Sequence, residues 1–108
     1  MRKLILFTEN DFEQSMKKAG LKTEDYSEEQ LFELRKGAMN GVDISVFSDP
    51  KLSNIQMKII RWGLEEGLDA SVYADPSISY YQMNQKFIQI EREHSCLGEL
   101  DLLLANVV

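Results

Sequence analysis

Residues 47–57 read FSDPKLSNIQM, and residues 73–83 read YADPSISYYQM. The longer segments 41–57 and 67–83 align without a gap and are identical at nine of seventeen positions. Five upstream residues recur at the same interval, since Ser27, Gln30, Arg35, Gly37 and Gly41 are matched by Ser53, Gln56, Arg61, Gly63 and Gly67. A fixed period in this range is typical of stacked helical units, because one unit cannot bury its apolar face alone. We therefore predict a mostly α protein, a stack of about four helices built from 26-residue helical repeats.

Each repeat carries signals for the start and the end of a helix. Ser27, Ser53 and Ser79 each lie three residues before a glutamine. This spacing is a capping box, in which the serine accepts a hydrogen bond from a first-turn amide and the glutamine reaches back to the serine amide. Gly41 and Gly67 supply the left-handed residue that ends a helix. These signals predict helices at roughly 28–40, 54–66 and 80–96.

A shorter copy of the same pattern lies upstream. Thr8 precedes Asp11 by three residues, and Gly20 follows where a helix should end. This pattern predicts a helix at roughly 9–19. Apolar pairs flank all four caps and are spaced as hydrophobic staples: Phe7 and Phe12, Tyr26 and Leu31, Leu52 and Met57, Ile78 and Met83.

The segments between the long helices predict short turns. Asp43 and Asp69 can each cap one turn, and the Asp-Pro pairs that follow stop it, because the residue before proline leaves the helical region. The apolar residues of the long helices recur at helical spacing and form the predicted core: Leu31, Leu34, Ala38, Met57, Ile60, Leu64, Met83, Phe87 and Ile90. Gly37 and Gly63 lie inside helices, and we expect them to permit a close approach of one helix to another.

The chain is predicted to form one domain, 1–108, with repeat-like units at about 8–26, 27–52, 53–78 and 79–108. Its ends are open to several interpretations. Residues 4–7 predict a short strand or an extended lead-in. Residues 100–108 can pair with it, form a last helical turn, cover the end of the stack or seat against a second copy. Some terminal cap is required, because an unfinished stack exposes its core.

Composition excludes several classes of function. Eighteen acidic and twelve basic residues leave a net charge of −6, which argues against direct nucleic-acid binding. The single cysteine cannot form an internal disulfide, and no apolar run is long enough for a signal peptide or a membrane span. These features predict a cytoplasmic protein without membrane attachment.

No motif in the sequence indicates chemistry. Nucleotide-binding, hydrolase and metal-binding signatures are lacking, so we predict no catalytic, cofactor-binding or metal-binding residues. His94 and Cys96 are two residues apart on a predicted helix and point in different directions. An acidic cluster is formed by Glu24, Asp25, Glu28, Glu29 and Glu33. Carboxylates favour a helix N-terminus, but the same cluster can imitate DNA phosphates.

Four residues are the predicted partner-binding surface: Arg61, Trp62, Tyr80 and Tyr81. The second unit has Asn54 and Ile55 where the third has the two tyrosines, so the scaffold does not require aromatic residues there. Exposed aromatic and arginine side chains are frequent binding hot spots. Trp62, which lies beside a helix stop, can instead belong to the core. Arg61 has two other roles open to it, pairing with Glu65 on the same helix or with an aspartate of the neighbouring unit.

The repeated residues resemble a family of short helical repeats in uncharacterised bacterial and mobile-element-associated proteins. The resemblance covers residues 27–90 and rests on these residues: Gln56-Met57, Ile60-Arg61, Gly63-Leu64-Glu65, Gly67-Leu68-Asp69, Tyr73-Ala74-Asp75-Pro76 and Gln82-Met83. It implies a helical stack and a mobile-element origin, but no activity.

We therefore predict a small acidic module that binds another protein and has no catalytic activity. The alternative is a phage or mobile-element inhibitor that mimics DNA and blocks a nucleic-acid enzyme. The partner is not named by any motif, and a homodimer is left open.

Overall fold

The protein is described by a computed structural model, which covers the backbone of residues 7–105 and the side chains of residues 7–94. Four α-helices follow one another: α1 (Glu9–Lys18), α2 (Glu28–Met39), α3 (Asn54–Glu65) and α4 (Tyr80–Ala105). Three 3-10 turns precede α2, α3 and α4: η1 (Thr23–Asp25), η2 (Ile44–Phe47) and η3 (Ala70–Tyr73). The mostly α class and the four-helix stack are confirmed. The strand considered at residues 4–7 lies largely outside the described residues.

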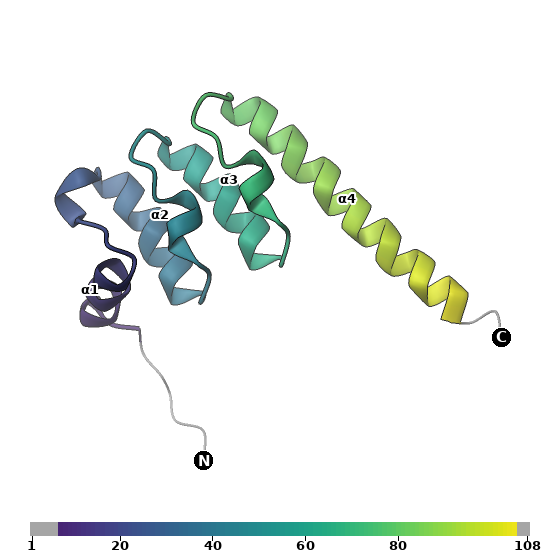
Figure 1. Cartoon of the computed structure of the whole chain (residues 1–108), viewed down its shortest axis with the longest axis horizontal. Helices are drawn as coiled ribbons and strands as arrows, with labels where there is room; N and C mark the ends of the chain where they lie inside the picture. Colours follow the sequence, from purple (N-terminus) through teal and green to yellow (C-terminus); the bar gives the residue numbers. More distant parts are fainter. Residues whose placement is uncertain (1–6, 106–108) are drawn as a thin grey trace, which may run out of the picture.

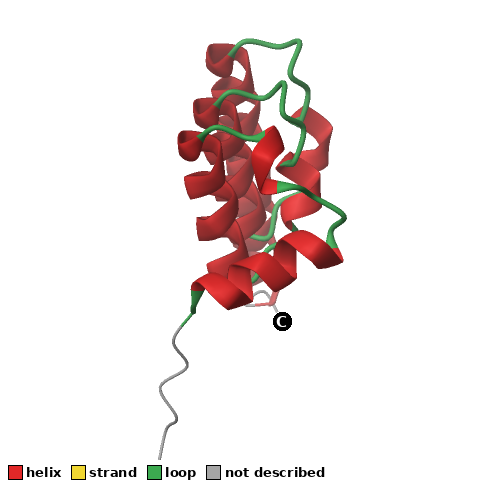
Figure 2. Ribbon diagram, turned by 90° about the vertical axis from the view of Figure 1, so that its left-hand side faces the viewer, coloured by secondary structure: helices red, strands yellow, loops and turns green. Residues whose placement is uncertain are grey.

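The long helices form a layer, with the 3-10 turns packed beside them. Figure 1 shows α2, α3 and α4 side by side, and Figure 2 shows α1 crossing the first of them. The molecule is a thin slab of 56 × 47 × 18 Å. Its radius of gyration of 16.5 Å exceeds the value of about 13 Å typical of a compact chain of this length. The structure is therefore an open stack with two ends, and each end exposes a face.

All four helix starts have the predicted capping box. The amide of the third helical residue donates to the cap oxygen at 3.2 Å in every case. Gly20, Gly41 and Gly67 follow the first three helices with φ of +73°, +77° and +77°. Glycine adopts this left-handed conformation without steric penalty. The predicted starts and ends of α1, α2 and α3 agree with the structure to within one residue.

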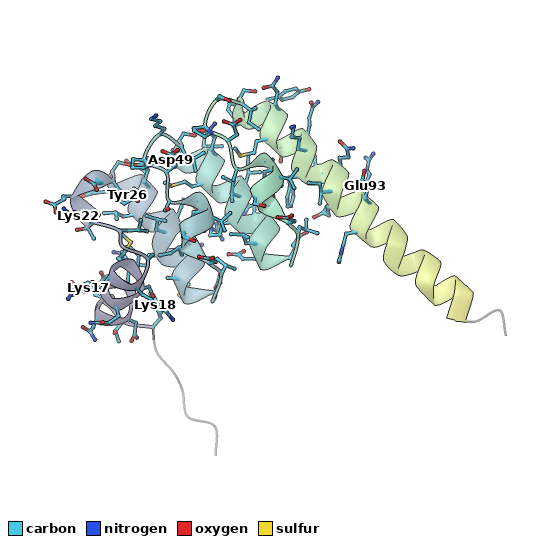
Figure 3. The ribbon with its side chains drawn as sticks, viewed as in Figure 1. Lys17, Lys18, Lys22, Tyr26, Asp49 and Glu93 are labelled. Carbon is cyan, nitrogen blue, oxygen red and sulfur yellow. The ribbon has the colours of Figure 1, made fainter. Side chains whose placement is uncertain are left out.

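The last helix is longer than predicted. The position that corresponds to Gly41 and Gly67 is occupied in α4 by Glu93, which Figure 3 labels. Without a left-handed residue to end it, the helix continues through Gly98 to Ala105 instead of stopping near residue 96. Residues 100–105 are therefore helical, and α4 extends beyond the layer (Figure 1).

The two short turns are capped differently. Asp43 accepts a hydrogen bond from the Ser45 amide at 3.1 Å, as expected. Asp69 caps no backbone amide, and its carboxylate accepts from the hydroxyl of Ser71 instead. The prediction that Asp69 caps the second turn is thus wrong, although η3 still forms.

The predicted core is confirmed, and the helical glycines have a specific role in it. Leu34, Met57, Ile60, Met83 and Phe87 are buried, while Leu31, Ala38, Leu64 and Ile90 are partly buried against them. A methyl group on Gly63 would overlap the Tyr73 hydroxyl, and one on Gly37 would meet the Phe47 ring. Each glycine therefore lets the aromatic ring of the following 3-10 turn lie directly on its helix, so the close contact is with that turn and not, as predicted, with a neighbouring long helix.

Two glutamines join successive units through a second set of bonds. The Gln30 side-chain amide donates to the carbonyls of Pro50 and Leu52 at 2.9 and 2.7 Å. Gln56 does the same for Pro76 and Ile78 at 3.4 and 2.7 Å. A glutamate could complete the capping box but could not donate these bonds. Glutamine at this position both starts its own helix and holds the next corner.

The free face of α4 is polar. It presents four exposed polar residues where α3 carries Gln56, Ile59, Ile60 and Gly63: Gln82, Gln85, Lys86 and Gln89. In α3 the corresponding surface is covered by η3 and α4. Lys86 on this exposed face interrupts the apolar register of the helix, at a position where an apolar residue would face water.

Candidate interaction surface

Arg61 lies inside the stack and not on its surface. The residue is 6% exposed. Its Nε donates to Glu33 Oε2 at 2.9 Å, and its Nη1 donates to Glu65 Oε1 at 2.6 Å. Burial acts to lower the pKa of Arg61, but the hydrogen bonds to Glu65 and Glu33 outweigh it and raise the pKa. The structure thus places this predicted partner-binding residue in the contact between α2 and α3.

This ion pair also removes one residue from the exposed part of the acidic cluster. Glu33 is 2% exposed and is committed to Arg61. The other four members of the cluster are exposed around η1 and the first turn of α2: Glu24, Asp25, Glu28 and Glu29. Glu33 is therefore a structural carboxylate, and the exposed acidic surface is smaller than the sequence predicts.

Arg35 makes the corresponding contact one unit earlier. Its Nη2 donates to Glu9 Oε2 at 3.1 Å, and its guanidinium lies 5.0 Å from the centre of the Phe12 ring. Glu9 and Phe12 belong to α1, so this arginine joins α1 to α2. Both repeated arginines therefore hold neighbouring helices together.

Large apolar side chains are exposed on every helix of the layer. We call them the exposed apolar set: Phe32 and Met39 on α2, Ile55 and Trp62 on α3, and Tyr80, Tyr81 and Ile88 on α4. On each helix two of them are seven residues apart, which places both on one side of that helix. The predicted residues Trp62, Tyr80 and Tyr81 are 40%, 58% and 64% exposed. The structure brings these three onto neighbouring helices.

Trp62 is held in place on one side and open on the other. Its ring centre lies 6.3 Å from that of Phe87 on α4, and Phe87 in turn meets the Tyr73 ring edge-on at 6.5 Å. Such aromatic packing orients the indole before any partner arrives. A side chain that is already ordered loses less conformational entropy on binding. Trp62 therefore has the geometry of a binding anchor.

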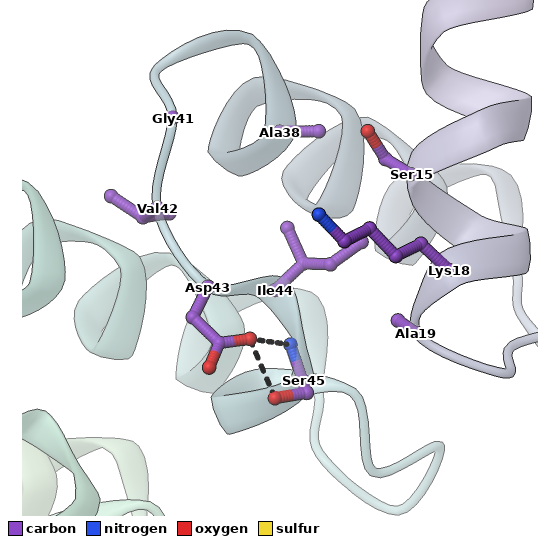
Figure 4. Close-up of a pocket in the computed structure, with 9 residues that line it drawn as sticks. All are labelled: Ser15, Lys18, Ala19, Ala38, Gly41, Val42, Asp43, Ile44 and Ser45. Carbon is purple, nitrogen blue, oxygen red and sulfur yellow. Dashed lines mark hydrogen bonds between the residues drawn. The ribbon is translucent and has the colours of Figure 1, made fainter.

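A hollow of about 720 Å³ lies between α1, α2 and η2. Figure 4 shows its lining, with the Lys18 side chain extending across it toward Ile44. The carboxylate of Asp43 is engaged by the amide and hydroxyl of Ser45 at 3.1 and 2.6 Å. The remaining wall is formed by small and apolar residues, Ala19, Ala38 and Val42 among them. The hollow therefore presents one positively charged side chain, that of Lys18, beside a small apolar surface.

Titratable groups elsewhere do not converge on a centre. Within the described part of the chain, no three His, Cys, Asp or Glu residues are grouped to hold a metal ion. His94 is exposed, and the side chain of Cys96 lies outside the described set, so their pairing is not tested. A hydrogen bond with the Glu91 carboxyl, together with burial, raises the pKa of Glu66 at the end of α3. This pair of acids lies between α3 and α4.

Comparison of the chain with protein-family models, with curated proteins and with solved structures finds no match. The resemblance to helical repeats of mobile-element-associated proteins therefore stays a prediction. None of the helices, as far as they are described, combines the length and apolar character that crossing a bilayer requires. The two features that sequence reasoning missed are the buried Glu33 and the second bonds of Gln30 and Gln56. For the second bonds, the sequence did contain a signal, because all three serine caps are followed by glutamine and not by glutamate.

Proposed function

We propose that this chain is a small cytoplasmic module that binds another protein through the exposed apolar set. The proposed role includes no catalysis, no cofactor, no membrane and no direct contact with nucleic acid. The observation that supports it is the exposure of aromatic residues on neighbouring helices of a rigid layer, with Trp62 held by Phe87. Stacked units are suited to this task because they hold variable side chains on an invariant frame.

The frame itself does not require these residues. Tyr80 corresponds to Asn54 in the preceding unit, and Trp62 corresponds to Lys36. Because the same backbone position accepts polar and apolar side chains, the aromatic residues are not needed for folding. Exposed aromatic residues of this kind are enriched among the side chains that contribute most to protein–protein affinity. Contact with a partner therefore best explains their presence.

The test begins with affinity capture from the native host and continues with the purified partner. Titration calorimetry then compares wild type with the double variant Tyr80→Ala, Tyr81→Ala. We expect the dissociation constant to rise roughly tenfold or more, because two hot-spot side chains are truncated. Val72→Ala is the matched control, since Val72 is 63% exposed but lies on η3. Unchanged affinity in the double variant would contradict the proposal.

The second candidate is an acidic inhibitor from a phage or mobile element. Four exposed carboxylates around the start of α2 favour it: Glu24, Asp25, Glu28 and Glu29. An inhibitor that imitates DNA should lose affinity steeply as salt is raised, because exposed charges are screened within about 10 Å at 0.1 M ionic strength. Binding through the exposed apolar set should be nearly insensitive to salt. The salt dependence of the captured complex therefore separates the two candidates.

A further inference from the structure

The stack contains three corners with the same backbone turn. In each, the residue before the serine cap donates its amide to the carbonyl three residues earlier: Tyr26 to Thr23 at 3.2 Å, Leu52 to Asp49 at 3.0 Å and Ile78 to Asp75 at 3.3 Å. Successive corners are separated by one repeat, and Figure 1 shows them along one edge of the layer. The three corners therefore share one backbone hydrogen bond, although the first corner is itself the 3-10 turn η1 and the other two follow η2 and η3.

Among the described residues, the hydrogen bonds that hold the corners leave one side-chain amide donor and one pair of carbonyl acceptors without a partner. Gln30 holds the second corner and Gln56 holds the third. Among the described residues, no hydrogen bond reaches the carbonyls of Glu24 and Tyr26 in the first corner. At the other end, Gln82 accepts from the Ser79 amide at 3.2 Å, but its own amide group has no described acceptor. One end of the stack lacks a donor, and the other lacks acceptors.

We propose that a second copy of this chain completes the series, head to tail. The side-chain amide of Gln82 in one copy donates to the carbonyls of Glu24 and Tyr26 in the next copy. The donor and the two acceptors of this contact occupy the same repeat positions as the donors and acceptors of the two corner bonds within the chain. Because the two surfaces differ, the association is heterologous and forms rings or open-ended chains.

The contact between copies is confined to the corners. The outer side of α2 is already occupied by α1, through the Arg35–Glu9 ion pair and the packing of Arg35 on Phe12. A second copy therefore cannot lay α4 along α2 as α3 does within the chain. The small contact that is left should be weak and reversible, because stable protein interfaces are much larger.

The charges at the two ends are complementary. A hollow of about 400 Å³ lies beside Gln82 and is lined by Ile78, Gln82, Gln85, Lys86 and Gln89. Lys86 is four residues after Gln82 and lies on the same side of α4. At the opposite end, the first corner is flanked by four exposed acids: Glu24, Asp25, Glu28 and Glu29. An ion pair between exposed charges at this contact should make the association sensitive to salt.

Sedimentation velocity over a range from micromolar to millimolar protein tests the proposal. Wild type should form a concentration-dependent series of oligomers, and added salt should weaken it. Gln82→Glu keeps the oxygen that completes the capping box but removes the donor, so it should weaken association about tenfold. Gln14→Glu is the control, because Gln14 is exposed on α1 and its replacement changes the net charge equally. It should associate like wild type.

Charge reversal at the two ends adds a positive test. Lys86→Glu alone and the double variant Glu24→Lys, Asp25→Lys alone should each lose self-association. The first brings an acid against the acidic corner, and the second brings two lysines against Lys86 and removes the net negative charge of the corner. An equimolar mixture of the two should associate again, since each end of one variant then faces an opposite charge on the other.

Two results would overturn the proposal. The first is a wild-type chain that stays monomeric at every concentration. The second is association that Gln82→Glu and Lys86→Glu leave unchanged, which would assign the contact to another surface such as the exposed apolar set. Circular dichroism of each variant shows whether its helices are intact.

Discussion

The Nε atom of Arg61 lies 2.9 Å from Oε2 of Glu33, on the preceding helix, and both side chains are almost fully buried. The pair therefore joins α2 to α3 inside the protein. One unit later, the corresponding positions are occupied by Ile59 and Phe87, which are also buried. The same place between two helices is thus filled by an ion pair in one unit and by apolar residues in the next.

This relationship predicts strong coupling between the two positions. Arg61→Phe should lower the free energy of unfolding by about 3–5 kcal/mol, because it leaves the buried Glu33 carboxylate without its partner. Glu33→Ile should cost less, because Arg61 keeps its ion pair with Glu65. The double variant copies the apolar pair of the following unit, and it should lie within about 2 kcal/mol of wild type. Urea unfolding of the four proteins measures the coupling. Additive losses would show that the two side chains do not form a buried pair.

The glycine beneath each aromatic ring predicts that alanine at this position lowers the stability of the protein, the reverse of its usual effect in a helix. In an ordinary helix interior, Gly→Ala stabilises by about 1 kcal/mol. Gly63→Ala should instead destabilise by about 1–3 kcal/mol, since its methyl group would overlap the Tyr73 hydroxyl. Adding Tyr73→Phe removes the overlapping oxygen and should recover part of the loss in thermal unfolding. A Gly63→Ala variant as stable as wild type would contradict the close packing of Tyr73 on α3.

The two acids between α3 and α4 predict a dependence on pH. The carboxyl of Glu91 raises the pKa of Glu66 above the ordinary value of 4.5. A raised folded-state pKa contributes stability that is present below the unfolded-state pKa and is lost as pH rises through the folded-state value. Glu91→Gln should therefore gain stability relative to wild type between pH 4 and pH 7, by a few tenths of a kcal/mol because the site is largely exposed. A difference in melting temperature that does not change with pH would be contrary to this pairing.

The local features of the fold could be predicted from the sequence because they depend on neighbouring residues. A capping box such as Ser53 and Gln56 spans three residues, and a helix stop such as Gly67 needs only its own conformation. Glu93 in place of that glycine carried the signal for the longer α4, whereas the prediction ended the helix near residue 96. The apolar seam was predictable for the same reason as the caps, since its residues recur at helical spacing.

Contacts between units were harder to predict. Charged residues are almost never fully buried unless they are paired, and the partner of Arg61 lies on a different helix, far from it in the sequence. Its burial could be known only once α2 and α3 were placed side by side. The second role of Gln56 was hidden because the capping box already accounts for a glutamine there. For the binding surface, the sequence correctly indicated the exposure of Trp62, Tyr80 and Tyr81 but misplaced Arg61.

The most direct test of the stacked architecture compares two glutamines that occupy the same position in successive units. Gln56→Glu and Gln82→Glu both keep the capping oxygen, but among the described contacts only Gln56 donates to a following corner in the same chain. Urea unfolding of the monomer should show a loss of about 1–3 kcal/mol for Gln56→Glu, because two carbonyls lose their donor, and little change for Gln82→Glu. Equal losses in the two variants, or no loss in Gln56→Glu, would contradict a stack held together by this repeated bond.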